Sequence, residues 1–138
     1  LEGCPKTVGG DFYCNDNQVT SLEYCPETVS GNFFCGNNQI TSLKYCPGTV
    51  GGDFYCGRNQ ITNFDGVPEF FEQSIYLYEN PVDEIYKLFN EDPRCIYWIR
   101  ELGVIQGDEV VRDRLEEVYH TLGMDIPNNI SLKEYILV

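Results

Sequence analysis

Cysteine has the widest chemistry of any residue type in this chain, because thiolates bind metals, form disulfides and act as nucleophiles. Seven cysteines are present, and six of them form two sets that repeat every 21 residues. Within each repeat, nine residues separate the first cysteine from the second. This is not a zinc-ligand spacing, and no histidine accompanies the cysteines. The sets are Cys4, Cys25 and Cys46, and Cys14, Cys35 and Cys56, while Cys95 stands alone.

A fourth copy of the repeat holds Val67 and Leu77 at the same two positions. A position that accepts Val or Leu suits a small hydrophobe, and a free cysteine packs as one. Stacked strands lie ~4.8 Å apart, so distance alone does not forbid a disulfide between repeats. The side chains would, however, point the same way into a packed core, and the number of cysteines is odd. The sequence therefore favours reduced core thiols and a reducing compartment, with disulfides between repeats or a metal as the alternatives.

Other residues that could support catalysis are few. His120 is the only histidine, and its place on an expected helix favours a surface or half-buried role. Asp11 and Asp53 share one column of the repeat, but Asn32 and Ser74 interrupt it, which indicates an exposed polar column rather than an acid/base pair or a calcium site. Phosphate loops, dinucleotide fingerprints and metalloprotease motifs are absent from the sequence. We therefore interpret the chain as non-enzymatic, with no cofactor and no bound metal.

The spacing of the cysteines is the period of whole rows of sequence. The first three rows share the pattern Leu-x-x-Cys-Pro-x-x-Val-x-x-x-Phe-x-Cys-x-x-Asn-x-(Val/Ile)-x-x with little change. They are row one, Leu1–Ser21, row two, Leu22–Ser42, and row three, Leu43–Asn63. Row four, Phe64–Glu84, replaces apolar residues by other apolar residues and keeps Asn and Pro. A fixed period of this kind predicts a solenoid, in which the apolar columns point inward and stack on one another.

The string Phe-x-Cys-x-x-Asn-x-Ile-x-x-Leu resembles the leucine-rich repeat core Leu-x-Leu-x-x-Asn-x-Leu-x-x-Leu. With the preceding Cys-Pro-x-x-Val, the rows are similar to the short bacterial-effector subtype. Their wording, Cys-Pro-x-x-Val-x-Gly-x-Phe-x-Cys-x-x-Asn-Gln-(Ile/Val)-Thr-Ser-Leu, is also similar to that of uncharacterised repeat proteins of tailed phages and environmental bacteria. The resemblance covers Leu1 to about Tyr86. It implies an α/β solenoid, a stack of four 21-residue turns with a short parallel sheet, and the family hosts many binding roles.

The resemblance implies one short parallel strand in each row, and the alternation of polar and apolar residues agrees. Phe12, Cys14 and their equivalents should point inward, and Asp11, Tyr13 and their equivalents outward. In the family, an asparagine after the strand turns inward and bonds backbone groups, and glycines before the strand allow a turn that wants freedom in φ. The strands are expected at Asp11–Cys14, Asn32–Cys35, Asp53–Cys56 and Ser74–Leu77, the asparagines are Asn17, Asn38, Asn59 and Asn80, and the glycines are Gly10, Gly31 and Gly52.

After the solenoid, residues 1–84, the pattern predicts an all-helical cap, residues 85–138, that covers the open end of row four. Apolar residues recur at helical spacing from Val82 to Phe89. Asp92 with Pro93 should open a second helix that stops at Gly103, and Gly107-Asp108 a third that stops at Gly123. Ser131 with Glu134 resembles a capping box for a last helix, Leu132–Val138.

The chain carries a net charge of −13, unevenly distributed. Residues 1–63 hold six acids and three bases, and residues 64–138 hold sixteen acids and six bases. This balance argues against nucleic-acid or anionic-membrane binding and allows a basic partner; mimicry of DNA charge is a sharper interpretation, but a solvated acidic helical face is the commoner cause. There is no apolar run that could span a bilayer and no signal peptide. We expect a reducing bacterial cytoplasm or a phage particle as the location.

No comparable cap is evident at the first row, whose apolar residues would form an uncovered face beside an open strand edge. Edges of this kind are association sites. We expect either that further rows precede Leu1 or that this end contacts a partner or a second copy of the chain. The residues of this face are Leu1, Cys4, Val8, Phe12, Cys14 and Val19.

One outward column of the expected strands is aromatic in all four rows. In the family this face is the concave surface, and exposed aromatic stripes usually mark contacts. The alternative is cross-strand pairing that only stabilises the sheet. The predicted partner-binding residues are Tyr13, Phe34, Tyr55 and Tyr76 with the flanking Asp11, Asn32, Asp53, Arg58 and Tyr78.

Three functions fit this pattern. The first is a non-catalytic protein-protein interaction module that binds a protein partner through the aromatic face or the uncapped end. The second is a structural subunit of a phage particle or another assembly. The third is a glycan-binding module that uses the aromatic column.

Overall fold

A computed structural model describes residues 1–68, 70–71 and 73–138, without the side chains of residues 70 and 71. The chain divides into two compact units, Leu1–Asn80 and Pro81–Val138. Phe71 holds the row-four position of Val8, Val29 and Val50, one of the apolar columns expected to point inward, and its side chain lies outside the described part of the chain.

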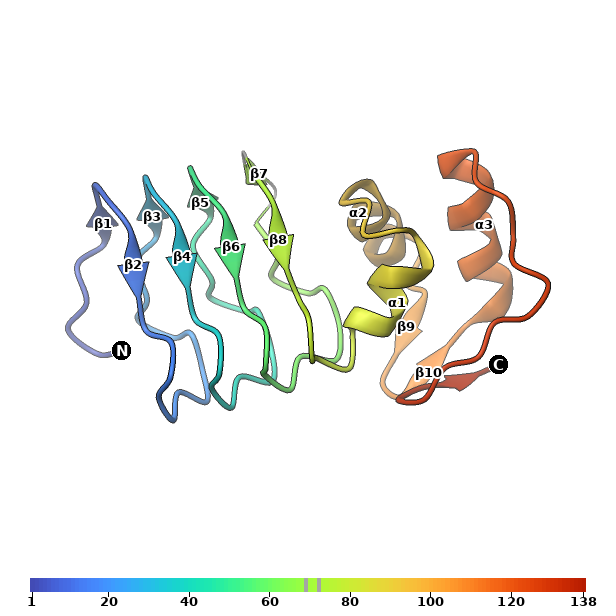
Figure 1. Cartoon of the computed structure of the whole chain (residues 1–138), viewed down its shortest axis with the longest axis horizontal. Coiled ribbons are helices and arrows are strands. Elements are labelled where there is room, and N and C mark those ends of the chain that lie inside the picture. The colour runs from blue at the N-terminus through green and yellow to red at the C-terminus, as the bar shows by residue number, and fades with distance from the viewer. Residues whose placement is uncertain (69, 72) are drawn as a thin grey trace. The chain divides into compact units, whose positions relative to one another are not determined.

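The first unit is a parallel β-solenoid of about three turns, with 21 residues between paired positions (Figure 1). Thr7 pairs with Thr28 and Phe12 with Phe33, and the same register continues through the following rows. The strands form two four-stranded sheets of order β1-β3-β5-β7 and β2-β4-β6-β8. The first sheet holds β1 (Thr7–Val8), β3 (Thr28–Val29), β5 (Thr49–Val50) and β7 (Phe70–Phe71), and the second holds β2 (Phe12–Tyr13), β4 (Phe33–Phe34), β6 (Phe54–Tyr55) and β8 (Ile75–Tyr76).

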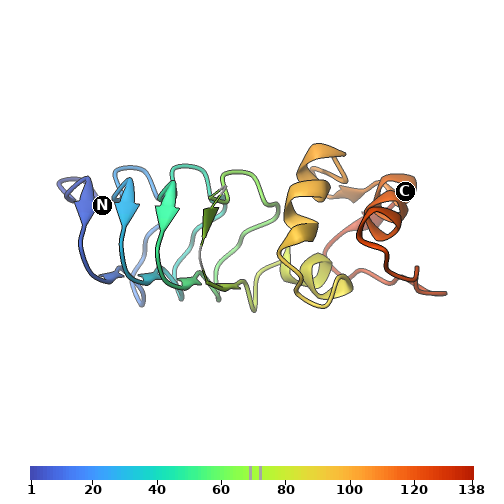
Figure 2. The same cartoon turned by 90° about the horizontal axis from the view of Figure 1, so that it is seen from above.

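The second sheet agrees with the expected strands, but the expectation of a single short parallel sheet is wrong. The Thr-Val pair that precedes each corner is also paired with its neighbours (Figure 2). The two β-branched residues favour extended backbone. Hydrogen bonding also continues through the corner, because Ser30 N–H donates to the Val8 carbonyl (2.9 Å) and Gly31 N–H donates to the Gly10 carbonyl (3.0 Å).

Three of the asparagines after the strands, Asn38, Asn59 and Asn80, turn inward, as expected, and join neighbouring rows. Asn17 of row one is exposed, and its amide bonds carbonyls of its own row. The Asn59 amide nitrogen donates to the carbonyls of Cys56 (3.0 Å) and Cys35 (3.1 Å), and its oxygen accepts the Ile40 N–H (3.0 Å). Asn38 and Asn80 repeat the pattern one row away. Each asparagine therefore satisfies backbone groups at a bend where strand pairing has ended. Asn17, Asn38, Asn59 and Asn80 are called the asparagine column below.

The interior of the solenoid is built from repeated apolar columns. Phe12, Phe33 and Phe54 stack with ring centroids 5.4 and 5.1 Å apart. Cys14, Cys35 and Cys56 are buried in this interior, and Cys4, Cys25 and Cys46 are half-buried at its margin. All six are free thiols, so no disulfide joins the rows. Cys35 and Cys56 are buried beside these rings. Packing of like residues on like residues at a fixed spacing leaves little room for a row of different shape.

The three glycines before the strands do not adopt a backbone conformation that requires glycine, since none of them has a positive φ. They are Gly10, Gly31 and Gly52. Gly31 and Gly52 are instead required by close approach. A Cβ on Gly52 would lie 2.9 Å from the Asn32 backbone nitrogen and 2.9 Å from the Gly31 carbonyl carbon. The expectation of a φ-driven turn is therefore wrong, and steric room between rows is the reason for glycine.

The second unit contains α1 (Asp83–Leu88), α2 (Arg94–Glu101) and α3 (Arg112–Leu122). The Asp92 carboxylate accepts the Arg94 N–H (2.9 Å) before α2, as a capping residue does. Gly123 ends α3 with a left-handed φ of 67°. α2 and α3 pack against each other.

The expectation of an all-helical second part is wrong, because the unit also holds a three-stranded sheet of order β11-β10-β9. Its strands are β9 (Ile105–Gln106), β10 (Glu109–Val110) and β11 (Ile136–Leu137). Gly107-Asp108 forms the two-residue turn between β9 and β10, with a φ of 64° at Gly107, so this pair is a hairpin signal rather than a helix start.

The predicted last helix, Leu132–Val138, is absent as well, since β11 pairs in parallel with β10. The Glu84 carboxylate accepts the backbone N–H groups of Lys133 and Glu134, both at 2.8 Å. A carboxylate from α1 thus takes the Glu134 N–H, which the Ser131 side chain would have bonded in a capping box.

Replacing Asn59 by Ala should lower the free energy of unfolding by about 2 kcal/mol, because it leaves the buried Ile40 N–H without its side-chain acceptor. The Cys35 and Cys56 carbonyls lose one of two asparagine donors and keep the amides of Asn38 and Asn80. Urea denaturation measures the change. Gln60→Ala, at the exposed neighbouring position, is the control and should stay within about 0.5 kcal/mol of the parent. Similar losses for both variants would contradict the role of the asparagine column.

Replacing Gly52 by Ala should lower the free energy of unfolding by about 2 kcal/mol, because the new methyl group meets the backbone of the preceding row. Gly10→Ala is the matched control, since a Cβ there meets nothing within 4 Å. Thermal melts of the two variants test the claim. Equal melting temperatures would show that steric room is not what selects glycine in this column.

Candidate functional site

The four outward aromatic residues predicted from the sequence form one continuous stack along the second sheet. The ring centroids of neighbouring rows are 4.6, 4.6 and 4.5 Å apart, and their planes differ by 5°, 7° and 4°. Strands β2, β4, β6 and β8 each contribute one ring, so the strand register sets the stack. Tyr13, Phe34, Tyr55 and Tyr76 are called the aromatic column below.

The aromatic column presents the edges of its rings to the outside, because each ring face between neighbours is covered by the next ring. Tyr13 is 64% exposed and Tyr76 39%, while Phe34 and Tyr55 in the middle are half-buried. Ring edges carry partial positive charge, and the faces partial negative charge. The exposed surface is thus a stripe of C–H edges and phenol groups.

Asp11, Asn32 and Asp53 line one margin of this stripe and also tie the rows together. The Asp11 Oδ1 accepts the Asn32 N–H (2.7 Å), and the Asn32 Oδ1 accepts the Asp53 N–H (2.7 Å). The Asp53 Oδ1 accepts the Ser74 N–H in the same way (2.9 Å). These side chains therefore have a structural role, in addition to the predicted role in binding.

The second oxygen of each aspartate binds a tyrosine of the aromatic column. The phenol of Tyr13 donates to Asp11 Oδ2 and that of Tyr55 to Asp53 Oδ2, each at 3.0 Å. The hydrogen bond from the Asn32 backbone, and then that from Tyr13, lower the pKa of Asp11. The hydrogen bond to Asp53 raises the pKa of Tyr55 to about 12. At neutral pH the tyrosines are thus neutral donors beside an ionised Asp11.

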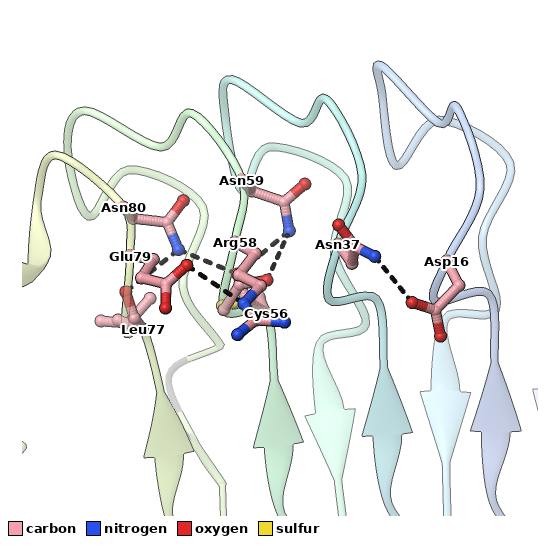
Figure 3. A network of polar contacts seen from close by, with 9 residues as sticks. Asp16, Asn37, Cys56, Arg58, Asn59, Leu77, Glu79 and Asn80 are labelled. Carbon is pink, nitrogen blue, oxygen red and sulfur yellow. Dashed lines mark hydrogen bonds and ion pairs between the residues drawn. The ribbon is translucent and has the colours of Figure 1, made fainter.

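Polar side chains also pair between rows past the end of the strands (Figure 3). The Asn37 amide donates to Asp16 (2.8 Å), and the Arg58 Nε donates to Glu79 Oε2 (3.0 Å). All four residues have positive φ between 54° and 59°. Arg58, predicted as a binding residue, therefore has a carboxylate partner within the solenoid.

Tyr78, the last predicted residue, packs over a glycine of the preceding row. A Cβ on Gly57 would lie 2.5–2.6 Å from the Cε atoms of the Tyr78 ring. Tyr78 remains 46% exposed, so one side of the ring is free for contact. The structure thus places all nine predicted residues in unit one, in pairs or stacks that link successive rows.

Two exposed tyrosines of the first unit, outside the aromatic column, were not predicted as site residues. Tyr24 and Tyr45 occupy the turn after the leucine of their rows, with φ of 67° and 68°. The equivalent residues of rows one and four are Gly3 and Gly66, which suit this conformation. The Lys44 ammonium lies 4.9 Å from the Tyr45 ring centroid. The sequence could have identified these two tyrosines, because they are aromatic residues at a repeat position that holds glycine in the other two rows.

The apolar residues of row one line an open hollow of about 720 Å³, with Leu1, Phe12, Val19 and Tyr24 in its wall. These residues are half-buried or exposed, whereas Phe33 and Ile40 in row two are buried. A contact of this face with a partner stays a prediction.

Burial holds several of the cysteine thiols in their protonated form. Burial raises the pKa of Cys14, Cys25 and Cys95 to about 12. The Cys46 thiol donates to the Gly66 carbonyl, with 2.7 Å between Sγ and the oxygen. Within residues 1–68, 70–71 and 73–138 no group of three or more His, Cys, Asp or Glu side chains is arranged to hold a metal ion.

Comparison with family models, with curated proteins and with solved structures gave no match for this chain. Among the residues that the structure describes, no helix is both long enough and apolar enough to cross a bilayer. The aromatic column and its margins are therefore interpreted from their geometry alone.

Replacing Asp53 by Asn should lower the pKa of Tyr55 from about 12 towards the ordinary value of 10.0, because the neutral phenol loses its carboxylate acceptor. NMR titration of the labelled tyrosine ring carbons measures the shift. Asp65→Asn, an exposed carboxylate elsewhere in the unit, should leave the Tyr55 titration unchanged. An unaltered titration in Asp53→Asn would disprove the pairing.

Proposed function

We propose that the solenoid is a non-catalytic protein-binding module whose contact surface is the aromatic column with its flanking residues. The observation that supports this proposal most is the stack itself, four rings held in register with their edges outward. Exposed aromatic stripes of this kind commonly mark contact sites, and aromatic residues supply much of the binding energy in protein interfaces.

The stack is also pre-organised, which favours binding. Each ring is fixed by its neighbours, and the phenols of Tyr13 and Tyr55 are fixed by aspartates. Little side-chain entropy remains to be lost when a partner contacts the surface. The same ring contacts also stabilise the sheet by cross-strand pairing. Partner binding and sheet stabilisation are therefore compatible roles for the aromatic column.

Glycan binding is the weaker alternative for this surface. Sugars bind aromatic residues by packing against ring faces, and the faces between Tyr13 and Tyr76 are occupied by the neighbouring rings. Protein contact needs only edges and phenols, which the surface offers.

The finer interpretations of the sequence stay predictions. These are the leucine-rich-repeat and phage subtype, the stack of four complete turns, the capping role of residues 85–138, the role in an assembly and the reducing location. The protein-binding proposal depends on none of them, since it rests on the side chains of unit one.

The double variant Phe34→Ala, Tyr55→Ala should lose the partner, because it removes the two central rings of the aromatic column. Affinity capture from the native host, with quantification of each retained protein, measures the loss. We expect a set of proteins that the parent retains at least about tenfold better than the double variant, as for the removal of an interface hot spot.

The matched control is Tyr24→Gly, Tyr45→Gly, which removes two exposed aromatics at positions where rows one and four carry glycine. This control should retain the same proteins as the parent. Circular dichroism establishes that both double variants keep the parent fold. Equal retention of every protein by the parent and the aromatic-column variant would refute the proposed surface.

A further inference from the structure

The charge beside the aromatic column is negative, and its two carboxylates stand at a defined spacing. The first unit holds ten acidic and three basic residues, a net charge of −7. Asp11 and Asp53 stand on the same margin in rows one and three, and the neutral Asn32 separates them. The column thus holds two carboxylates, two rows apart, beside the ring edges, with Asn32 and Ser74 in the other two rows.

The spacing of these carboxylates follows from the strand register. Neighbouring parallel strands lie ~4.8 Å apart, so positions two rows apart are separated by about 9.6 Å. A polyproline II helix rises ~3.1 Å per residue with three residues per turn, so every third side chain returns to the same side after about 9.3 Å. The two repeats agree to within a few tenths of an ångström over the length of the site.

The other margin of the aromatic column carries no unpaired positive charge among the predicted site residues, so it would not repel a cationic ligand. Arg58 is the one basic residue among the nine predicted site residues, and Glu79 neutralises it at 3.0 Å. Asp16 adds a further negative charge near the row-one end. A second copy of this chain is a poor occupant, because its net charge of −13 would repel the surface.

We propose that the aromatic column binds an extended basic segment of its partner in polyproline II conformation, with cationic side chains at every third residue paired to Asp11 and Asp53. The residues between the cations lie over the ring edges of Phe34 and Tyr55, where proline rings make apolar contact, as in other aromatic-lined sites for such segments. This inference rests on the proposed function and names the chemistry of its partner.

Two synthetic peptides of equal composition test the spacing. One repeats Lys-Pro-Pro four times, which places lysines at every third residue, and the other places its four lysines at alternate residues. Calorimetric titration into the full chain should give about fivefold tighter binding of the first peptide, the size expected from two solvent-exposed ion pairs. Equal affinities for the two peptides would overturn the inference.

The carboxylates are tested with Asp11→Asn, Asp53→Asn, a change that the fold accepts because row two carries Asn32 in this column. This variant should lose the preference for the first peptide. The charge-matched control Glu23→Gln, Asp65→Asn removes two exposed carboxylates from other positions and should keep the preference. A preference that persists in the first variant, or disappears in the control, would contradict the pairing.

The outcomes separate this inference from the proposed function. If the host partner is lost in Phe34→Ala, Tyr55→Ala while the two peptides bind the parent equally, the surface is a binding site and its ligand is not a basic polyproline segment. If neither the host partner nor the first peptide is affected by that double variant, the proposed function fails together with the inference.

Discussion

The structure depends on one repeated constraint, which is that each row must present its backbone donors and acceptors to the next row at the same places. Strand pairing meets this need for only two residues of each row in each sheet. The asparagine column and the Asp11, Asn32 and Asp53 side chains meet it beyond the strands, as acceptors and donors between rows. With so little regular secondary structure, these side chains hold the register, and a row with different chemistry could not join the stack without leaving buried polar groups unpaired.

The same constraint creates the surface. Because the register is fixed at 21 residues, every outward position becomes a column with a spacing of one strand, and a column of aromatic residues must stack face to face. The stack turns edges and phenols outward and brings the aspartates into a fixed alternation. A repeating protein surface suits a ligand that itself repeats, and an extended chain segment provides such a repeat without needing a fold of its own.

Much of this arrangement could be predicted from the sequence, because a repeated row shows which positions share an environment. Val67 and Leu77 revealed that the cysteines belong to the core, and the inward asparagine and outward tyrosine followed from their order in the row. The first sheet, β1-β3-β5-β7, was missed because a Thr-Val pair is too short to show alternation. Gly31 was assigned to a turn because the sequence does not reveal how closely two backbones approach. In the second unit no repeat exists, so Gly107-Asp108 was taken for a helix start instead of a hairpin. The roles of Tyr78 and Arg58 needed coordinates, since their neighbours are 21 residues distant.

The central claim is that the outward ring edges of the aromatic column touch another protein. Photo-cross-linking tests it most directly, with p-benzoylphenylalanine in place of Phe34 and, as reference, in place of the exposed Tyr97 of the second unit. The account predicts that position 34 forms a discrete covalent adduct with one protein in host extract and that added Lys-Pro-Pro peptide suppresses this adduct. Position 97 should form no such adduct. The same weak, unspecific adducts from both positions would contradict it.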